Sequence, residues 1–304
     1  MKVLFTRGAP KWVHEELEAE GHTGVDVPAD EYVDQEKFAK EINNFDVYVS
    51  GGIEDCSRPV IETADNLKAI MFLGVDYKNY IDADAASEKN IPIINTPGAN
   101  ARAVAEITLL LMMMSARKIP LMIHSLGQKE WQSQNGFELQ NKTLGIIGSG
   151  PIAQELASMA HGIGMDVVYH SRSGEKNGMM GVCHSFEDVL KAADILSLNV
   201  PKDAGQIIGK EELGLMKNSA ILINTAPAML VNANALHDAL ETGEISYAAF
   251  DCFYAEGDDA WKCDEAKLIS LGADKFCITP HTGFSTTEAS DNMFRIIVDA
   301  IKSL

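Results

Sequence analysis

The segment Gly148-Ser149-Gly150-Pro151-Ile152-Ala153 constrains the fold of this chain more than any other. It follows the apolar run at residues 144–147 and opens a segment whose apolar residues recur at helical spacing. Alone, such a motif is often a plain tight turn, but between a strand and a helix it predicts a dinucleotide-binding site. The two glycines permit the turn and the approach of a pyrophosphate, and the small last residue permits close packing. Helix N–H groups then face the phosphates, so we expect contacts from Gly148, Gly150, Pro151 and Ile152.

Short apolar runs alternate with amphipathic segments along the whole chain, which indicates α/β units around parallel sheets. The first third resembles a small doubly wound, flavodoxin-like sheet. Its predicted strands are residues 3–6, 24–27, 46–50, 68–73 and 92–95, and its predicted helices are 11–20, 35–42, 59–63 and 81–89. A second series has six predicted strands, the number that a complete Rossmann sheet needs. They are residues 143–147, 166–170, 194–200, 220–224, 247–251 and 277–279.

Two domains are expected, because the chain has 304 residues and single cores usually stop growing near about 250. Pro97-Gly98 breaks regular structure and marks a hinge. The apolar segment at 101–117 predicts a long helix buried between domains or subunits, and residues 286–304 predict a helix that returns to the first domain. We therefore expect a flavodoxin-like substrate domain at 1–97 with 285–304, and a Rossmann domain at 98–284.

The amino-acid composition disfavours several classes of partner. The net charge of −19 disfavours nucleic acid and anionic membranes. The five cysteines are scattered, which argues against a zinc site or a disulfide framework and favours reduced, cytoplasmic thiols. The longest apolar stretch, at residues 107–114, is too short to span a bilayer. We expect a cytoplasmic protein whose partner is a small molecule.

The end of the second strand in the second series distinguishes between the two nicotinamide dinucleotides. A protein that binds NAD usually has Asp or Glu there, to bind the ribose 2′-hydroxyl. This chain has Ser171, Arg172 and Ser173 instead, with no acid. A serine hydroxyl and the guanidinium fork suit a 2′-phosphate, although a solvated loop arginine is the ordinary alternative. We expect NADP(H) in preference to NAD(H), which stays the second candidate.

Several further segments follow one another at the spacing of a known family. They are Asn95-Thr96-Pro97-Gly98, Val104-Ala105-Glu106, the Gly148–Ala153 turn, the Leu-Gly-Leu-Met-Lys run at 213–217, Leu222-Ile223-Asn224-Thr225-Ala226, Asp251-Cys252-Phe253-Tyr254-Ala255-Glu256 and Thr279-Pro280-His281. On these segments, nearly the whole chain resembles the D-isomer-specific 2-hydroxyacid dehydrogenases.

The resemblance implies reversible hydride transfer between a nicotinamide and a 2-keto or 2-hydroxy acid. It places the acid/base histidine at His281 and its carboxylate partner at Glu256. The chemistry agrees, because a histidine near its neutral pKa can give a proton to a carbonyl oxygen and take it back. A nearby carboxylate orients the ring and favours the imidazolium. Each residue alone would be an ordinary strand-end histidine or loop acid, so the expectation depends on the pair.

The resemblance also implies the remaining contacts of the site and the assembly. Matching positions place the nicotinamide beside Thr225, Ala226 and Asp251, the adenosine near Asn199 and Pro201, further cofactor contacts at His281 and Gly283, and the substrate carboxylate on the backbone of Leu73, Gly74 and Val75. Asp76 fits the family pattern but is interpreted as structural. The family resemblance further implies a homodimer, with the long helix near its twofold axis.

One position departs from the family pattern. The family has a catalytic arginine directly after the Asn-Thr-Ala segment, where this chain has Pro227. A guanidinium matches the two oxygens of a 2-keto acid, and proline offers no charge. Three explanations stay open: a cation from elsewhere replaces it, the substrate lacks the usual carboxylate, or the protein senses a dinucleotide without efficient turnover. By rough position, the candidate cations are Arg7, Arg58, Lys78 and Arg102.

Overall fold

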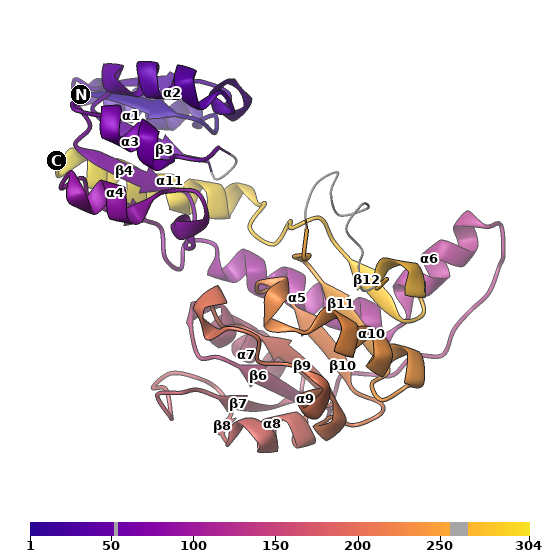
Figure 1. Cartoon of the computed structure of the whole chain (residues 1–304). Helices are drawn as coiled ribbons and strands as arrows, with labels where there is room; N and C mark the ends of the chain where they lie inside the picture. Colours follow the sequence, from indigo (N-terminus) through magenta and orange to yellow (C-terminus); the bar gives the residue numbers. More distant parts are fainter. Residues whose placement is uncertain (52–53, 256–266) are drawn as a thin grey trace. The chain divides into compact units, whose positions relative to one another are not determined.

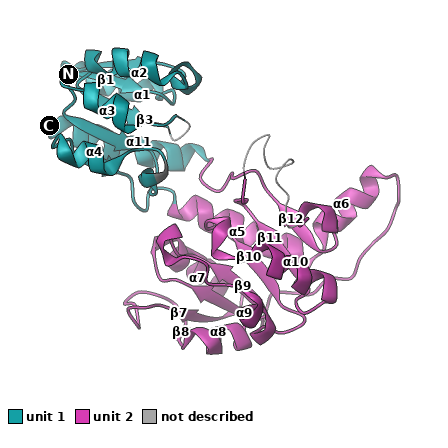
Figure 2. Cartoon of the chain, viewed as in Figure 1, with its two compact units in different colours: residues 1–100, 286–304 teal, residues 101–285 magenta. Residues whose placement is uncertain are grey.

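The computed structural model describes residues 1–51, 54–255 and 267–304. They form two compact units, one of Met1–Asn100 with Thr286–Leu304 and one of Ala101–Ser285 (Figure 2). The boundaries expected from sequence, after residue 97 and before residue 285, lie three residues and one residue from these. Each unit has its own parallel sheet and its own core, and each is described by itself.

The first unit contains a five-stranded parallel sheet in the order β2-β1-β3-β4-β5. This is the strand order of doubly wound flavodoxin-like folds, so that part of the predicted fold class is confirmed. The strands are β1 (Lys2–Phe5), β2 (Thr23–Asp26), β3 (Val47–Ser50), β4 (Ala69–Phe72) and β5 (Ile93–Asn95).

Alternate residues of these strands face two separate helical layers, as the two-residue period of a strand requires. Val3 and Phe5 pack with α1 (Lys11–Ala19) and α11 (Thr287–Lys302). Leu4 packs on the opposite face with helices α2 (Gln35–Glu41), α3 (Arg58–Thr63) and α4 (Ala83–Glu88). The C-terminal helix α11 belongs to this first unit.

The second unit contains a seven-stranded parallel sheet in the order β12-β11-β10-β9-β6-β7-β8. Its strands are β6 (Thr143–Ile147), β7 (Asp166–His170), β8 (Val182–Cys183), β9 (Ile195–Leu198), β10 (Ile221–Asn224), β11 (Tyr247–Phe250) and β12 (Phe276–Ile278). The predicted count of six is wrong by one edge strand, β8, whose two residues are too few to show a pattern. The order reverses between β6 and β9, which is where Rossmann sheets bind their ligand.

Helices cover both faces of this sheet. Helices α5 (Ala101–Ala116) and α7 (Pro151–Gly162) share one core with it. Helices α8 (Phe186–Ala192), α9 (Lys210–Leu215) and α10 (Ala233–Thr242) share the other. Helix α6 (Ile119–Gly127) projects away from the sheet (Figure 1).

Short 3₁₀ helices complete the two units. They are η1 (Ala29–Tyr32), η2 (Ile42–Asn44), η3 (Tyr77–Asn79), η4 (Lys202–Ala204), η5 (Ala228–Leu230) and η7 (Ile269–Leu271).

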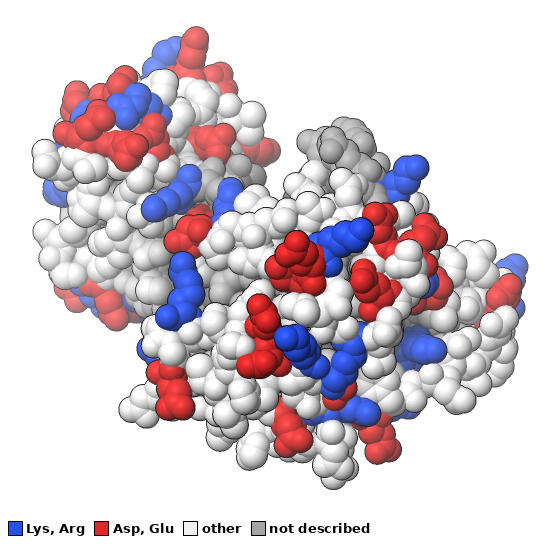
Figure 3. Space-filling model, turned by 60° about the horizontal axis from the view of Figure 1, so that its bottom comes forward, with Lys and Arg blue, Asp and Glu red and all other residues white. Residues whose placement is uncertain are grey.

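Two surface properties bear on the partners. Acidic and basic side chains are interspersed on the face drawn in Figure 3, so the basic residues visible there do not form a continuous patch. Within the described ranges, no single helix has the length and hydropathy to cross a bilayer. Helices α5 and α6 reach that length only as a pair bent by 69°.

Candidate active site

The glycine turn joins the ends of three strands in the second unit. Gly148 has a φ of +118°, and a Cβ there would lie 2.2 Å from the carbonyl oxygen of Asn199. Its N–H donates to the carbonyl of His170 at 2.9 Å. Only glycine fits this position, since a side chain would meet both the φ penalty and the clash.

The start of α7 after this turn suits a phosphate. Gly150 precedes the helix and Pro151 is its first residue, where the missing N–H of proline costs no helix bond. A Cβ on Gly150 would meet no atom within 4 Å, so the backbone is open to a ligand. Ala153 is fully buried, as close packing of helix and strand requires. These features fit the pyrophosphate of a dinucleotide.

The end of β7 carries a chain of hydroxyl groups. Ser149 Oγ donates to Ser171 Oγ at 3.0 Å, and Ser171 Oγ lies 3.0 Å from Ser173 Oγ. Arg172 is exposed, and no carboxylate of the described ranges pairs with it. The structure therefore brings Ser171, Arg172 and Ser173 together beside the glycine turn. It adds Ser149, whose hydroxyl bonds to Ser171 and which the sequence did not indicate as part of this group.

The carboxyl ends of β11 and β12 are tied together by Asp251. This buried carboxylate accepts hydrogen bonds from Thr279 Oγ at 2.6 Å, Thr282 N at 3.0 Å and Gly283 N at 2.7 Å. Its main-chain carbonyl accepts from the N–H of His281 at 2.7 Å. A carboxylate with this many donors holds the turn at 279–283 in one conformation.

His281 stands in that turn with a φ of +51°, a left-handed conformation that is uncommon for any residue except glycine. Such a conformation costs about 1–3 kcal/mol and is kept only where its surroundings enforce it. The imidazole meets the ring of Phe284 edge to face, with 5.5 Å between the ring centroids. Its predicted partner, Glu256, lies outside the described residues.

The turn after β10 is clamped by a buried asparagine. Asn224 Oδ1 accepts from Ala226 N at 3.1 Å, and Asn224 Nδ2 donates to Pro227 O at 3.4 Å. Pro227 then leads into η5. Thr225 is partly exposed, and its hydroxyl lies 2.9 Å from that of Thr108 on α5. This threonine contact is the second feature of the edge that the sequence did not suggest.

The end of β9 lies beside these turns in the sheet. Asn199 N donates to Ile147 O at 2.8 Å, and Asn199 Oδ1 accepts from Ser197 Oγ at 3.1 Å. Pro201 is exposed and directly precedes η4. Both predicted adenosine contacts thus lie on the carboxyl edge, next to the glycine turn.

The predicted substrate loop of the first unit offers fewer amides than expected. Leu73 N donates to Ser50 O at 3.2 Å, and Gly74 N donates to Phe72 O at 2.9 Å. Within the described ranges the N–H of Val75 has no acceptor, while its carbonyl accepts from Asn95 Nδ2 at 2.8 Å. Val75 therefore supplies the main-chain donor of this loop that is left for a ligand.

A buried acid at the same edge of the first unit has no sequence signal. Thr6 Oγ and Tyr48 Oη both donate to Glu54 Oε1, and no residue that the structure describes bonds to Glu54 Oε2. Burial and the Glu54 carboxylate hold the pKa of Tyr48 well above its usual value. From sequence, Glu54 is an ordinary loop acid, because its burial depends on strands distant along the chain.

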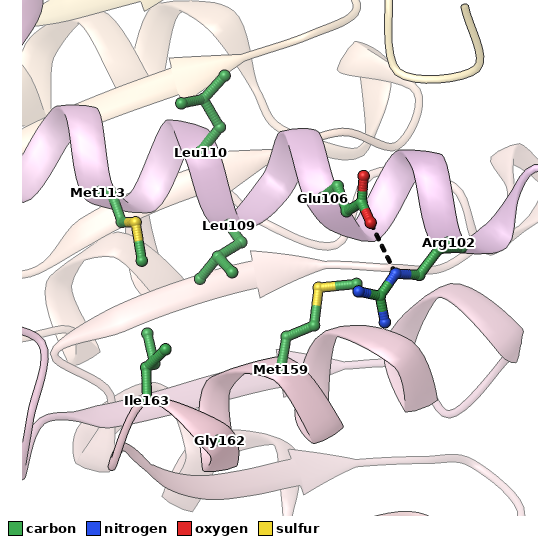
Figure 4. A pocket seen from close by; sticks show the side chains of 8 residues that line it. All are labelled: Arg102, Glu106, Leu109, Leu110, Met113, Met159, Gly162 and Ile163. Atoms are coloured by element: carbon green, nitrogen blue, oxygen red, sulfur yellow. Dashed lines mark hydrogen bonds and ion pairs between the residues drawn. The ribbon is translucent and has the colours of Figure 1, made fainter. Parts of the chain in front are cut away.

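Among the candidate replacement cations, Arg58 and Arg102 pair with carboxylates. Arg58 pairs with Glu88 at 2.7 Å. Arg102 pairs with Glu106 at 2.7 Å and Glu155 at 3.3 Å. Figure 4 shows the Arg102–Glu106 pair at one end of an open pocket of about 440 Å³ between α5 and α7. Each guanidinium would have to give up an existing ion pair to bind a substrate carboxylate. Lys78 is exposed on η3, and Arg7 follows Thr6, the residue after β1.

A Rossmann-ordered sheet with a phosphate turn at its switch point, and a histidine on the same edge, is the arrangement of dinucleotide-binding proteins. Comparison with known proteins agrees. The profile of the D-isomer specific 2-hydroxyacid dehydrogenase NAD binding domain matches residues 109–283, and the chain belongs to this family.

Curated relatives and a solved structure extend the match. The chain is 36% identical over 278 residues to a D-3-phosphoglycerate dehydrogenase of Methanocaldococcus jannaschii, covering 89% of this chain and 52% of the relative. It is 33% identical to a hydroxypyruvate reductase of Thermotoga maritima, covering 89% and 88%. An acyclic imino acid reductase solved with NADPH and D-Arg has a TM-score of 0.84 at 25% identity, covering 100% and 96%. The chain thus spans about half the length of the first relative and most of the others.

Proposed function

We propose that the protein is an NADP(H)-preferring oxidoreductase that transfers a hydride between the nicotinamide and a small 2-keto or 2-hydroxy acid, or a related carbonyl compound. The observation that carries the proposal is the turn at 279–283, where Asp251 fixes His281 on the carboxyl edge. Relatives named as reductases and dehydrogenases of hydroxy acids support the reaction class.

In this proposal the bound nicotinamide supplies or receives the hydride, and the chain handles the proton and the substrate. His281 donates a proton to the carbonyl oxygen in reduction and removes it in oxidation. Glu256 orients the imidazole and favours its protonated form. The N–H of Val75 binds the substrate carboxylate, and Leu73 and Gly74 shape that loop through their own hydrogen bonds.

The preference for NADP(H) rests on the end of β7. The three hydroxyls of Ser149, Ser171 and Ser173 and the exposed guanidinium of Arg172 present donors where an NAD-binding site has a carboxylate. A carboxylate would repel a 2′-phosphate, whereas these groups attract it. The structural neighbours include one solved with NADPH and one solved with NAD⁺, so the proposed preference rests on the residues of this chain. The adenosine contacts proposed at Asn199 and Pro201, and the nicotinamide contacts at Ala226 and Gly283, are shared by either dinucleotide.

Pro227 bears on how strongly the site can bind the carboxylate of a substrate. Without the family arginine, the carboxylate of a 2-keto acid loses its bidentate partner. A single amide at Val75 is a weaker anchor, so we propose a substrate whose binding depends less on its carboxylate. A dinucleotide sensor without efficient turnover is the alternative that Pro227 favours.

We further propose a cytoplasmic homodimer. The cysteines of the described ranges are free thiols, which supports a reducing compartment. Exposed hydrophobic side chains gather on α5, α6 and the segment after α6, which supports an interface between two copies. They are Leu110, Met113, Ile123, Leu126 and Trp131.

NADPH oxidation with a panel of 2-keto acids and aldehydes tests the proposed reaction. We expect turnover of at least one carbonyl compound. His281→Ala should lower kcat by about 10² to 10⁴ because it removes the acid/base group, while NADPH still binds through the glycine turn and the end of β7. Binding of NADPH without reduction of any member of the panel would select the sensor instead.

A further inference from the structure

Two threonine hydroxyls connect helix α5 to the end of β10. Thr108 is fully buried, and its Oγ lies 2.6 Å from the carbonyl oxygen of Val104, one helical turn earlier. The same Oγ lies 2.9 Å from Thr225 Oγ. Thr225 itself is partly exposed on the carboxyl edge, at the start of the turn that Asn224 clamps.

Counting hydrogens assigns a direction to this chain of bonds. A carbonyl oxygen only accepts, so the bond to Val104 uses the single hydrogen of the Thr108 hydroxyl. The bond between the threonines must then use the hydrogen of Thr225. Thr225 Oγ is left with lone pairs alone, and it can only accept a hydrogen bond from a ligand.

Helix α5 also fixes where this acceptor stands. Thr108 has no exposed surface, and its bond to Val104 holds one rotamer of its side chain. The same part of α5 touches the histidine turn, since a Cβ on Gly283 would meet Ile107 Cγ2 at 3.2 Å. One rigid helix therefore supports both the turn at Thr225 and the turn at 279–283.

We propose that Thr108 is a positioning residue that makes Thr225 a pure acceptor, and that Thr225 accepts a hydrogen bond from the carboxamide NH₂ of the nicotinamide. The proposal rests on the proposed function, because it assumes a nicotinamide beside Thr225. It goes beyond that function because it assigns the group of the carboxamide that Thr225 recognises: the NH₂ and not the carbonyl oxygen. A dinucleotide whose ring bears a group with an acceptor but no donor binds less well.

Binding of NADP⁺ and of its 3-acetylpyridine analogue to the full chain tests the proposal. The analogue keeps the carbonyl oxygen and replaces NH₂ with CH₃. Isothermal titration of the wild type should show about fivefold to tenfold tighter binding of NADP⁺, as one ordinary hydrogen bond gives. Thr225→Val should lower NADP⁺ affinity and leave analogue affinity unchanged, so that the ratio falls toward one.

Thr108→Val gives the more specific signature. It frees the hydrogen of Thr225, which then donates to the acetyl oxygen, so affinity for the analogue should rise by a few fold. Thr108→Ser retains the hydroxyl and should keep the wild-type ratio. Thr242→Val is the matched control, because Thr242 Oγ donates to the carbonyl four residues earlier at 2.8 Å, as Thr108 does, but is exposed on α10. Circular dichroism verifies that each variant is folded.

Equal affinity of the wild type for the two dinucleotides would overturn the inference, as would a Thr108→Val variant that loses affinity for both alike. In either case the cofactor site itself still stands. A wild type that binds neither dinucleotide would remove the proposed function together with this inference, so the two failures are distinguishable.

Discussion

Arg172 is the single side chain on which the cofactor preference depends most. Its guanidinium is exposed at the end of β7, beside the linked hydroxyls of Ser149, Ser171 and Ser173. Arg172→Ala should lower NADPH affinity by about tenfold to a hundredfold, since a charge-assisted hydrogen bond contributes about 1.5–3 kcal/mol. NADH, which has no 2′-phosphate, should bind as before. Fluorescence titration of both cofactors measures the ratio, and an unchanged ratio would refute the 2′-phosphate assignment.

Asp251 shows how one carboxylate can organise a reactive turn. Its oxygens accept from two main-chain N–H groups and from Thr279 Oγ. Asp251→Asn keeps the size but replaces one acceptor with a donor, which faces Thr279 Oγ or the N–H of Gly283. We expect kcat to fall at least tenfold, because the turn no longer fixes His281, and the melting temperature to fall by several degrees.

Steady-state kinetics and thermal unfolding check this expectation. Asp188→Asn serves as the control, because Asp188 accepts a hydrogen bond from Ser185 at 2.6 Å on an exposed helix start far along the chain from the edge. An Asp251→Asn variant with wild-type kcat would show that the turn does not depend on the carboxylate.

At the scale of elements, strong periodicity in the sequence located most strands. Strands β6 and β7 begin and end where the sequence predicts, at Thr143–Ile147 and Asp166–His170. The prediction for β9 overran, since the strand ends at Leu198 where the chain turns and Asn199 N bonds to Ile147 O. The sequence did not predict helix α6. Lys118 takes a left-handed conformation between α5 and α6, and no residue pattern predicts such a break there.

Only part of the candidate site could be predicted from the sequence, because several of its contacts join residues that are distant along the chain. The glycine turn and His281 carry motifs that require those residue types, so the sequence could indicate them as candidates. The bonds of Asp251, the Thr108–Thr225 contact and the burial of Glu54 join residues that lie far apart along the chain. Such contacts depend on the tertiary fold, and a single sequence does not display them.

Asp194, directly before β9, connects elements at the amino edge of the sheet, opposite the candidate site. Burial alone would raise the pKa of Asp194, but hydrogen bonds from Lys217 Nζ at 2.8 Å and Thr143 N at 2.9 Å lower it below its usual value. A folded-state pKa below the unfolded value means that the ionised carboxylate stabilises the fold above the unfolded pKa. That stabilisation is lost as pH falls through the folded pKa.

Lys217→Met should therefore destabilise the protein at pH 7 by about 1–2 kcal/mol, as expected for a partly buried charged hydrogen bond. The difference from wild type should begin to shrink as the pH falls below about 3.9, the usual aspartate pKa, and should be lost fully only below the lower folded-state pKa of Asp194. Urea unfolding at pH 7, 5 and 3 measures it. A difference that stays constant over this range would mean that Lys217 contributes through packing and not through its charge.

At the scale of the whole molecule, exposed apolar surface suggests how copies of the chain associate. Leu110 is 51% exposed and Met113 is 40% exposed on α5, where they line the open pocket shown in Figure 4. Trp131, in the segment after α6, is 93% exposed. A protein with a net charge of −19 repels its own copies at long range, so their association requires a local apolar surface of this kind.

The double variant Leu110→Glu with Met113→Glu should convert the proposed dimer to a monomer, because it places two carboxylates on the surface that the partner would bury. Val33→Glu is the matched control, since Val33 is an equally apolar side chain, 70% exposed, in the other unit. Sedimentation velocity over a range of protein concentrations distinguishes the two masses. If the double variant and the control sediment alike at every concentration, the exposed face of α5 is not part of the interface, and its apolar side chains belong to the surface of a monomer or to a different contact.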